Sequence, residues 1–226
     1  MIYLKKRVKR KIKFRSFIIV FLVIIVIAII FLVFTNIHLK NIYVSGNTII
    51  KDQEIIEYLG LEDYPCIIKI NTSSLKKLLN KNVLVKSSSV KRVGLTGISI
   101  DIKENYPLFF DKNKDKTVLL DGRTTSYIDS ATLINYVPDK KYNKLIKKLA
   151  NIDRNILSNV SEIEYQPNDV DDELFLLRMK DGNYVYITLI KSGSLNEYVN
   201  IIKNFKGKKG ILYLDSGEYF KVLEGS

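Results

Sequence analysis

Apolar residues form one long unbroken run near the start of the chain and short alternating runs after it. Residues 17–34, FIIVFLVIIVIAIIFLVF, are eighteen consecutive apolar residues without a charge, a proline or a glycine. At about 1.5 Å per residue, a helix of this length spans roughly 27 Å, close to the ~30 Å of a bilayer's hydrocarbon core. No small-residue cleavage site follows in TNIHLK. The run therefore predicts a retained membrane-spanning helix rather than a signal peptide.

The residues before this run carry a concentrated positive charge. Eight of them, all within positions 1–15, are Lys or Arg and none is acidic, against a formal net charge of +12 for the whole chain. By the positive-inside rule, residues 1–16 are a cytoplasmic tail and the remainder of the chain lies outside the cell, the topology of a single-pass type II protein. Anionic lipid headgroups account for the basic cluster, so we expect no nucleic-acid partner.

Residues 39–107 show the pattern of a small domain with strands at both ends and helices between them. A strand through Ile42 and Val44 ends at a Gly46-Asn47 turn. Two amphipathic helices follow, in KDQEIIEYLGL and NTSSLKKLLN, and then two strands, in VLVKSSSVKRV and GISIDIKE. This order predicts a βααββ unit, in which a three-stranded sheet is covered on one face by two helices.

Residues 108–226 are richer in strands. Asp121-Gly122 and Asp181-Gly182 predict hairpin turns, the second between two long alternating runs. A helix is predicted in DKKYNKLIKKLANI, and a capping box of Ser194 and Glu197 predicts the start of another. The chain closes in GILYLDSGEYFKVL, two apolar runs around a turn. The predicted fold class is α+β: one transmembrane helix, a small βααββ domain, and a strand-rich mixed domain.

Reactive side chains are scarce. Cys66 and His38 are the only residues of their kinds, so neither an intramolecular disulfide nor a zinc shell is expected. A nucleophile activated by His38 would have to lie at the bilayer surface, three residues beyond the apolar run. We therefore expect a protein that is not an enzyme, with no catalytic residue, cofactor, metal or small-molecule substrate.

Two charged segments allow more than one interpretation. The acidic segment NDVDDE, residues 168–173, lacks the glycine and the distal glutamate of an EF-hand loop, which favours a solvated loop over a calcium site. The five lysines between Lys140 and Lys148 lie opposite the apolar stripe of a predicted helix. An amphipathic helix on a sheet needs such a solvated face. Contact with anionic lipid or wall polymer is the alternative.

The closing hairpin is the best candidate for a binding surface. A terminal strand often lies at the edge of a sheet, where its free backbone groups recruit another strand. Tyr213, Tyr219 and Phe220 are suited to anchor such a partner. Their alternative role is to form part of the core of the protein's own sheet, and the sequence does not choose between the two.

Three stretches together resemble the FtsQ/DivIB family of bacterial cell-division proteins. They are IYVSGNTIIKDQEII at the start of the outer part, SSSVKRVGLTGISIDIKENYP, and the closing GILYLDSG. The resemblance covers essentially the whole chain and identifies residues 39–107 as similar to a POTRA domain, a docking module. Gly94-Leu95-Thr96-Gly97 departs from the family, which usually has a proline in this turn.

The resemblance implies a scaffold at the division septum that is not an enzyme and helps to regulate septal peptidoglycan synthesis. Its expected partners are two single-span coiled-coil proteins, FtsB/DivIC and FtsL, and the family's closing strand pairs with FtsB/DivIC. Carried over by motif, the expected partner-binding residues are Tyr213, Leu214, Ser216, Tyr219, Phe220 and Val222. A membrane-anchored cell-wall enzyme and an envelope sensor are the alternatives.

Overall fold

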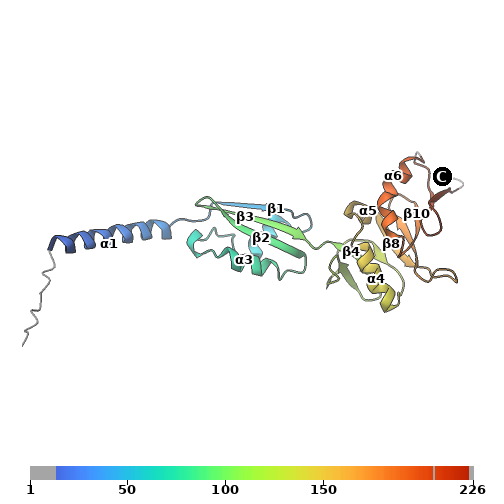
Figure 1. The fold of residues 1–226 in the computed structure, drawn as a ribbon, viewed down its shortest axis with the longest axis horizontal. Coiled ribbons are helices and arrows are strands. Elements are labelled where there is room, and N and C mark those ends of the chain that lie inside the picture. The colour runs from blue at the N-terminus through green and yellow to red at the C-terminus, as the bar shows by residue number, and fades with distance from the viewer. Residues whose placement is uncertain (1–13, 206, 224–226) are drawn as a thin grey trace, which may run out of the picture. The chain divides into compact units, whose positions relative to one another are not determined.

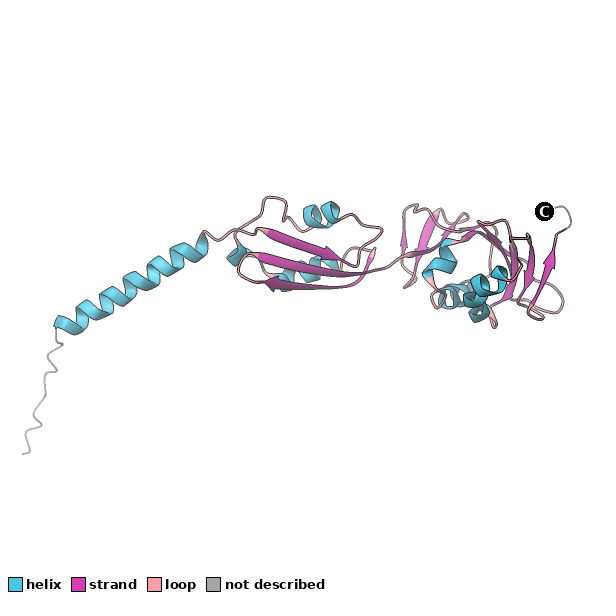
Figure 2. Ribbon diagram, turned by 90° about the horizontal axis from the view of Figure 1, so that it is seen from above, coloured by secondary structure: helices cyan, strands magenta, loops and turns pink. Residues whose placement is uncertain are grey.

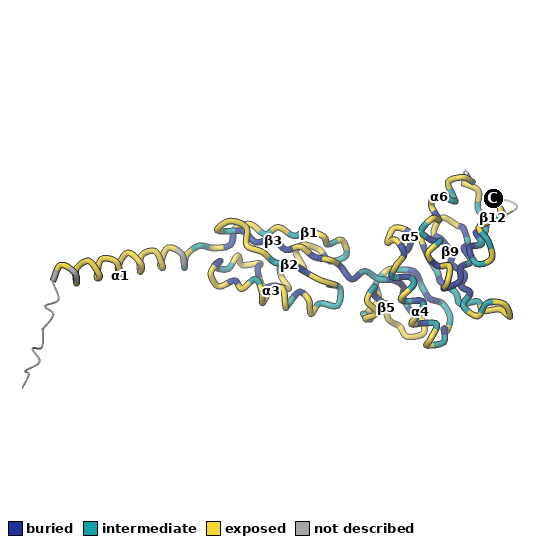
Figure 3. The backbone as a smooth tube through the Cα atoms, viewed as in Figure 1, coloured by how far each residue is buried: buried dark blue, intermediate teal, exposed yellow. Residues whose placement is uncertain are grey.

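A computed structural model describes residues 14–205 and 207–223, without the side chains at positions 14, 16 and 34. Most of the predicted basic tail, residues 1–13, lies outside the described residues. The first element, α1 (Phe14–Thr35), is a helix whose described apolar side chains from Phe17 to Val33 are exposed (Figure 3). Counting only described positions, no helix of the chain has both the length and the apolar character needed to cross a bilayer. The spanning helix stays a prediction.

The chain after α1 forms two sheets (Figures 1 and 2), and the whole chain divides into two compact units, the first of which includes α1. The first unit comprises residues 1–45, 51–79 and 89–101. The second unit comprises residues 46–50, 80–88 and 102–226. One end of the three-stranded sheet therefore belongs to the second unit.

The three-stranded sheet has the strand order β1-β3-β2, with β1 parallel to β3. The elements of residues 41–104 follow the predicted order, with one 3-10 helix, η1, that was not predicted. They are β1 (Asn41–Ser45), α2 (Asp52–Tyr58), η1 (Ile67–Lys69), α3 (Thr72–Leu79), β2 (Val85–Val93) and β3 (Gly97–Glu104). The βααββ prediction is thus confirmed in order and in strand number, and the Gly94–Gly97 turn forms without a proline.

Local chemistry sets the limits of these elements. The Asn71 side chain caps α3, because its Oδ1 accepts the backbone N–H groups of Ser73 at 3.0 Å and Ser74 at 3.2 Å. Gly60 follows α2 with φ +63°, a left-handed conformation that ends a helix at little cost for glycine. Along β3, Ile98, Ile100 and Ile102 are buried as the alternating pattern predicted.

A buried carboxylate fixes the turn after β1. Glu104 Oε1, at the end of β3, accepts the backbone N–H groups of Thr48 at 2.8 Å, Ile49 at 2.6 Å and Ile50 at 3.1 Å. Burial by itself raises the pKa of this carboxyl, but the three N–H donors favour the charged form and leave the pKa below its ordinary value. One carboxylate oxygen therefore holds the backbone of residues 48–50, directly after Gly46-Asn47.

The larger sheet has nine strands, ordered β12-β11-β10-β9-β8-β7-β4-β5-β6, and mixes parallel with antiparallel pairs. Its first strands are β4 (Pro107–Asp111), β5 (Lys116–Leu119), β6 (Thr124–Thr125), β7 (Thr132–Leu133) and β8 (Val160–Tyr165). The later ones are β9 (Leu174–Met179), β10 (Tyr184–Thr188), β11 (Gly210–Tyr213) and β12 (Tyr219–Val222). Both predicted hairpin turns are confirmed, since β5 pairs with β6 and β9 with β10.

Three helices and one 3-10 helix accompany this sheet. They are α4 (Asp139–Leu149), α5 (Arg154–Ser158), η2 (Ser192–Glu197) and α6 (Tyr198–Lys203). Tyr142, Leu145 and Leu149 bury the predicted stripe of α4 in a core that includes Phe109, Phe175 and Val185. The capping-box prediction was wrong: Ser194 and Glu197 lie inside η2, and α6 begins at Tyr198 without a side-chain cap.

A buried amide joins β11 to the rest of the sheet. Asn183, 1 % exposed, follows the Asp181-Gly182 turn, and its Oδ1 accepts the Gly210 N–H at 2.9 Å. Its Nδ2 donates to the hydroxyl of Tyr198 at 3.0 Å and to Asp181 Oδ1 at 3.1 Å. Tyr198 in turn donates to Asp181 Oδ2 at 2.7 Å. One buried network thus connects the hairpin turn, α6 and the first residue of β11.

Replacing Gly46 should destabilise the protein more than replacing Gly60, which has a similar φ but open space around its Cβ position. A Cβ at Gly46, where φ is +80°, would collide with the Ile102 carbonyl oxygen. We expect Gly46→Ala to lower the free energy of unfolding by about 2–4 kcal/mol, from left-handed strain and overpacking together. Gly60→Ala is the control, since φ is similar and no atom lies within 4 Å of its Cβ. Equal losses in chemical denaturation would contradict the collision.

Removing the Asn183 amide should destabilise the second unit. Asn183→Ala leaves the buried Gly210 N–H without its acceptor, for an expected loss of about 1–3 kcal/mol in the free energy of unfolding. Asn200→Ala is the matched control, because this exposed amide donates only to Glu197, and we expect a change within about 0.5 kcal/mol. Denaturation curves that coincide for the two variants would exclude the buried network as a source of stability.

Candidate partner-binding edge

The closing strand lies at one edge of the nine-stranded sheet. β12 pairs antiparallel with β11, with Tyr219 opposite Tyr213 and Val222 opposite Gly210, and has no other strand partner among the described residues. β11 lies between β12 and β10, and its pairing with β10 is parallel. The sequence-based expectation of a terminal edge strand is therefore confirmed.

The direction of the backbone groups at this edge follows from the pairing. The Leu223 N–H donates to the Lys209 carbonyl at 2.9 Å, so Leu223 directs its backbone toward β11. Backbone groups alternate in direction along an antiparallel strand, and Phe220 and Val222 therefore direct their N–H and C=O groups away from the sheet. These are the groups that an added strand would meet.

The six sequence-predicted binding residues occupy different environments. Tyr219 is 51 % exposed and Val222 38 % exposed on β12, and Ser216 is exposed in the turn. Phe220 is half-buried against Phe205, at 4.3 Å between ring centroids, and Tyr213 is half-buried on β11. Leu214 is 1 % exposed and belongs to the core, so its side chain is not available to a partner in this structure.

A row of tyrosines crosses the last three strands on one face. Tyr186 of β10 stacks on Tyr213 of β11 at 5.4 Å, and Tyr213 stacks on Tyr219 of β12 at 4.6 Å. Sequence reasoning missed Tyr186, because only the parallel pairing of β10 with β11 brings it beside the closing hairpin. Burial, followed by the charges of Tyr213, Glu164 and Asp215, raises the pKa of the Tyr186 hydroxyl above its ordinary value.

The tyrosine row borders a groove of about 450 Å³. Its wall includes Gln166 and Asn168 from the segment after β8 together with Tyr186, Tyr213 and Asp215. The Asp215 Oδ1 atom is buried and has no hydrogen-bond partner among the described residues. No pattern in the sequence indicated this groove, since its wall comes from four separate parts of the chain: residues 166–168, Leu174, Tyr186, and Tyr213 with Asp215.

The lysine face and the acidic segment contact each other. Lys141 Nζ lies 2.6 Å from Asp172 Oδ2 and donates to the Tyr165 hydroxyl at 2.9 Å, while Lys144 pairs with Glu173. The pKa of Lys141 is raised and that of Asp172 is lowered, each chiefly by the hydrogen bond between them. The predicted solvated loop is therefore partly a salt-bridge partner of α4.

Cys66 and His38 meet in the first unit. They form an isolated antiparallel bridge, and the buried Cys66 thiol donates to the Thr35 carbonyl at 2.9 Å. His38 is exposed, with its Nδ1 2.9 Å from the Asn36 carbonyl oxygen. Among the described residues, no group of three or more His, Cys, Asp or Glu side chains is arranged to hold a metal ion.

Comparison with known proteins gives consistent matches. The model of the FtsQ-type POTRA domain matches residues 37–105. Cell division protein DivIB of Listeria monocytogenes is 27 % identical over 194 residues, 81 % of this chain and 72 % of that protein. DivIB of Bacillus cytotoxicus is 28 % identical over 233 residues, 97 % of this chain and 91 % of that protein. DivIB of Bacillus subtilis is 26 % identical and covers 96 % of this chain and 87 % of that protein.

A solved structure also matches part of the chain. It is the major extracytoplasmic domain of the trans isomer of DivIB from Geobacillus stearothermophilus, with a TM-score of 0.38 and 20 % identity. The match covers 46 % of this chain and 95 % of that one. Residues 37–105 therefore match an FtsQ-type POTRA domain, and most of the chain is similar to the DivIB cell-division proteins.

Proposed function

We propose that this protein is a scaffold of the division machinery that is not an enzyme and binds its partners by strand addition at β12. The partners are FtsB/DivIC-like and FtsL-like coiled-coil proteins, and the complex helps to regulate septal peptidoglycan synthesis. The observation that carries the proposal is the free outer edge of β12 in the nine-stranded sheet. The FtsQ-type POTRA match and the similarity to the DivIB division proteins support a role in binding rather than in catalysis.

The edge has two features that favour recruitment of a strand. Phe220 and Val222 direct backbone donors and acceptors outward, and an added strand gains hydrogen bonds with them. Tyr219 and Val222 add exposed apolar surface on the two faces of the same strand. An edge that is blunted against aggregation usually carries a proline, a bulge or several charges, whereas β12, YFKV, has one lysine.

The proposed domain organisation follows the sequence. Residues 1–16 are a cytoplasmic tail, residues 17–34 span the cell membrane once, residues 39–107 form the POTRA-like domain, and residues 108–226 form the β domain. The continuous helix of α1, with apolar side chains exposed on every side, supports the spanning segment. Both folded parts then lie outside the cell, enriched at the septum, where the membrane restricts partner search to two dimensions.

Charges at the centre of the apolar run should release the protein from the membrane. Ile24→Arg together with Ile25→Arg costs about 5–7 kcal/mol of insertion free energy, because each arginine at a helix centre costs about 2.5–3.5 kcal/mol. We expect the double variant to appear in the soluble fraction after an alkaline wash of isolated membranes. Thr35→Arg with Asn36→Arg is the control, since these positions end the run. Retention of both variants would refute a spanning segment at residues 17–34.

A proline on β12 should block strand addition without removing the hairpin. Val222→Pro deletes an outward N–H and places a ring at the free edge, while the Leu223 bond to Lys209 on the inner side is kept. We expect at least a hundredfold loss of affinity for the DivIC-type protein of the same organism, measured between full-length proteins in detergent.

The control for this experiment is Val222→Ala, which removes side-chain surface but keeps the backbone donor. Its affinity should fall by less than about tenfold. If Val222→Pro binds as well as Val222→Ala, strand addition at β12 is excluded.

A further inference from the structure

The groove beside the tyrosine row has a chemical character of its own. Its wall carries two amides, two tyrosines and one carboxylate, and no lysine or arginine lines it. The tyrosine row leads from Tyr186 in the groove to Tyr219 on the free edge of β12. The groove is therefore continuous with the proposed binding edge, on the same face of the sheet.

Asp215 is the charged group of this groove and lacks a cation. Its buried Oδ1 has no hydrogen-bond partner, and no described Lys or Arg nitrogen lies within 4.0 Å of its carboxylate. Lys191 is nearby, but its Nζ donates to the main-chain carbonyl of Asp215 at 2.8 Å. A carboxylate held in a partly buried wall without a partner costs stability, since its lost hydration is not replaced.

Four carboxylates of the same unit, by contrast, have a cation partner. Arg178 pairs with both Glu162 and Glu164, Lys141 with Asp172, and Lys144 with Glu173. Each of these acids is satisfied within the protein. Among the described residues, no group of three or more His, Cys, Asp or Glu side chains that could hold a metal ion lies at the groove, and Asp215 is the one carboxylate in its wall.

We propose that the groove binds a guanidinium or ammonium group from a basic side chain of the partner that adds to β12. This inference rests on the proposed strand addition and names the partner's chemistry at a second contact. Because β10 lies two strands from the edge, about 10 Å away, the basic residue belongs to a segment flanking the paired strand rather than to the strand itself. Asp215 supplies the charge-assisted hydrogen bond, and the hydroxyl oxygens of Tyr186 and Tyr213 in the groove wall supply further acceptors.

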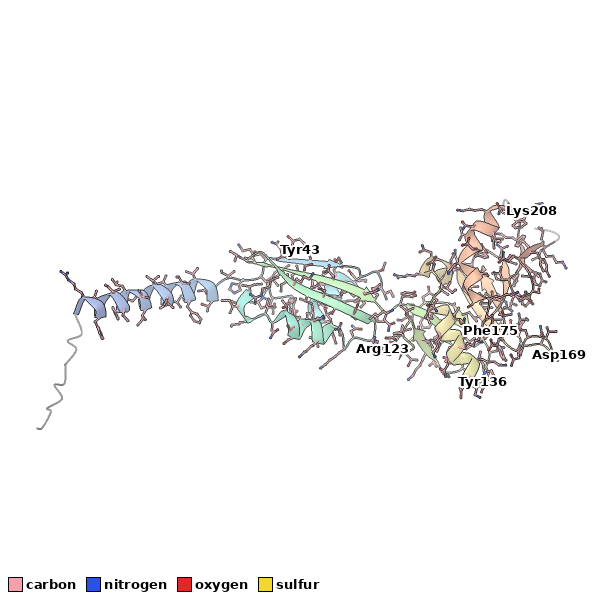
Figure 4. All side chains as sticks on the ribbon, viewed as in Figure 1. Tyr43, Arg123, Tyr136, Asp169, Phe175 and Lys208 are labelled. Atoms are coloured by element: carbon pink, nitrogen blue, oxygen red, sulfur yellow. The ribbon has the colours of Figure 1, made fainter. Side chains whose placement is uncertain are left out.

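The test measures affinity between the full-length chain and the full-length DivIC-type protein of the same organism, both in detergent. Asp215→Asn keeps the shape and removes the charge, and we expect a 10- to 100-fold loss of affinity. Its melting temperature should be unchanged or higher, because the unpaired carboxylate is gone. Asp169→Asn is the matched control: this exposed aspartate (labelled in Figure 4) lies outside the groove wall, and its affinity should stay within twofold.

A second variant tests the groove without changing Asp215. Gln166→Lys places a cation in the wall beside the carboxylate, so it should compete with the partner's basic group and weaken binding at least tenfold. Next, each Arg and Lys of the partner is replaced by Ala. One such replacement should weaken binding to the unchanged chain. The same replacement should not lower the affinity for Asp215→Asn any further, because the two residues act through one contact.

Several results would overturn the proposal. The first is that both Asp215→Asn and Gln166→Lys bind the partner with full affinity. The second is that every partner replacement lowers the affinity for Asp215→Asn as much as it lowers the affinity for the unchanged chain. A melting temperature several degrees lower for Asp215→Asn, with full affinity of Gln166→Lys, would assign Asp215 a structural role instead. If Val222→Pro abolishes binding while both groove variants bind fully, only the groove proposal fails. If Val222→Pro binds normally, strand addition and the groove proposal fail together.

Discussion

The hydrogen bond from the Gly210 N–H to Asn183 Oδ1 decides where the end of the chain lies. Gly210 begins β11, and the bond positions it beside the start of β10, so that β11 runs parallel to β10. β12 pairs only with β11, and its edge position therefore depends on this join. Glycine is required at position 210, because a Cβ there would meet the Lys221 carbonyl oxygen and the Phe220 ring. A single buried amide thus organises the whole candidate interface.

Some charged residues of the second unit form ion pairs that connect separate segments. α4 directs Lys141 and Lys144 to the acidic segment, and Arg178 lies between Glu162 and Glu164. Such exposed pairs contribute little stability individually. Their value here is positional, because they hold the segment after β8 that forms one wall of the groove. Asp215 differs from these paired acids, because its buried Oδ1 has no hydrogen-bond partner among the described residues, and an unsatisfied buried atom of this kind favours a role in binding.

In the three-stranded sheet, a similar role belongs to Glu104. Its carboxylate accepts three successive backbone N–H groups from the turn after β1, where Gly46 adopts a conformation that other residues rarely reach. The turn that opens the POTRA domain is therefore completed by a residue more than fifty positions later. Both sheets use one buried polar side chain to fix a turn that local sequence only proposes.

The sequence by itself determined the elements whose signals are local. The strand with Ile98, Ile100 and Ile102, the helix in NTSSLKKLLN and the hairpin turns at Asp121-Gly122 and Asp181-Gly182 were all predicted, because side-chain periodicity and turn chemistry act over a few residues. A local signal also failed at Ser194 and Glu197, where tertiary packing of Leu195 and Tyr198 favours a 3-10 helix.

Only the tertiary structure decided which segments meet. The pairing of the lysine face with residues 168–173, the burial of Leu214 and the placing of Tyr186 beside Tyr213 depend on contacts between residues far apart in the chain. The place of Tyr186 follows from the parallel pairing of β10 with β11, for which a single sequence has no periodic signal. The closing strand was therefore foreseeable from the sequence as an edge, whereas the groove beside it was not.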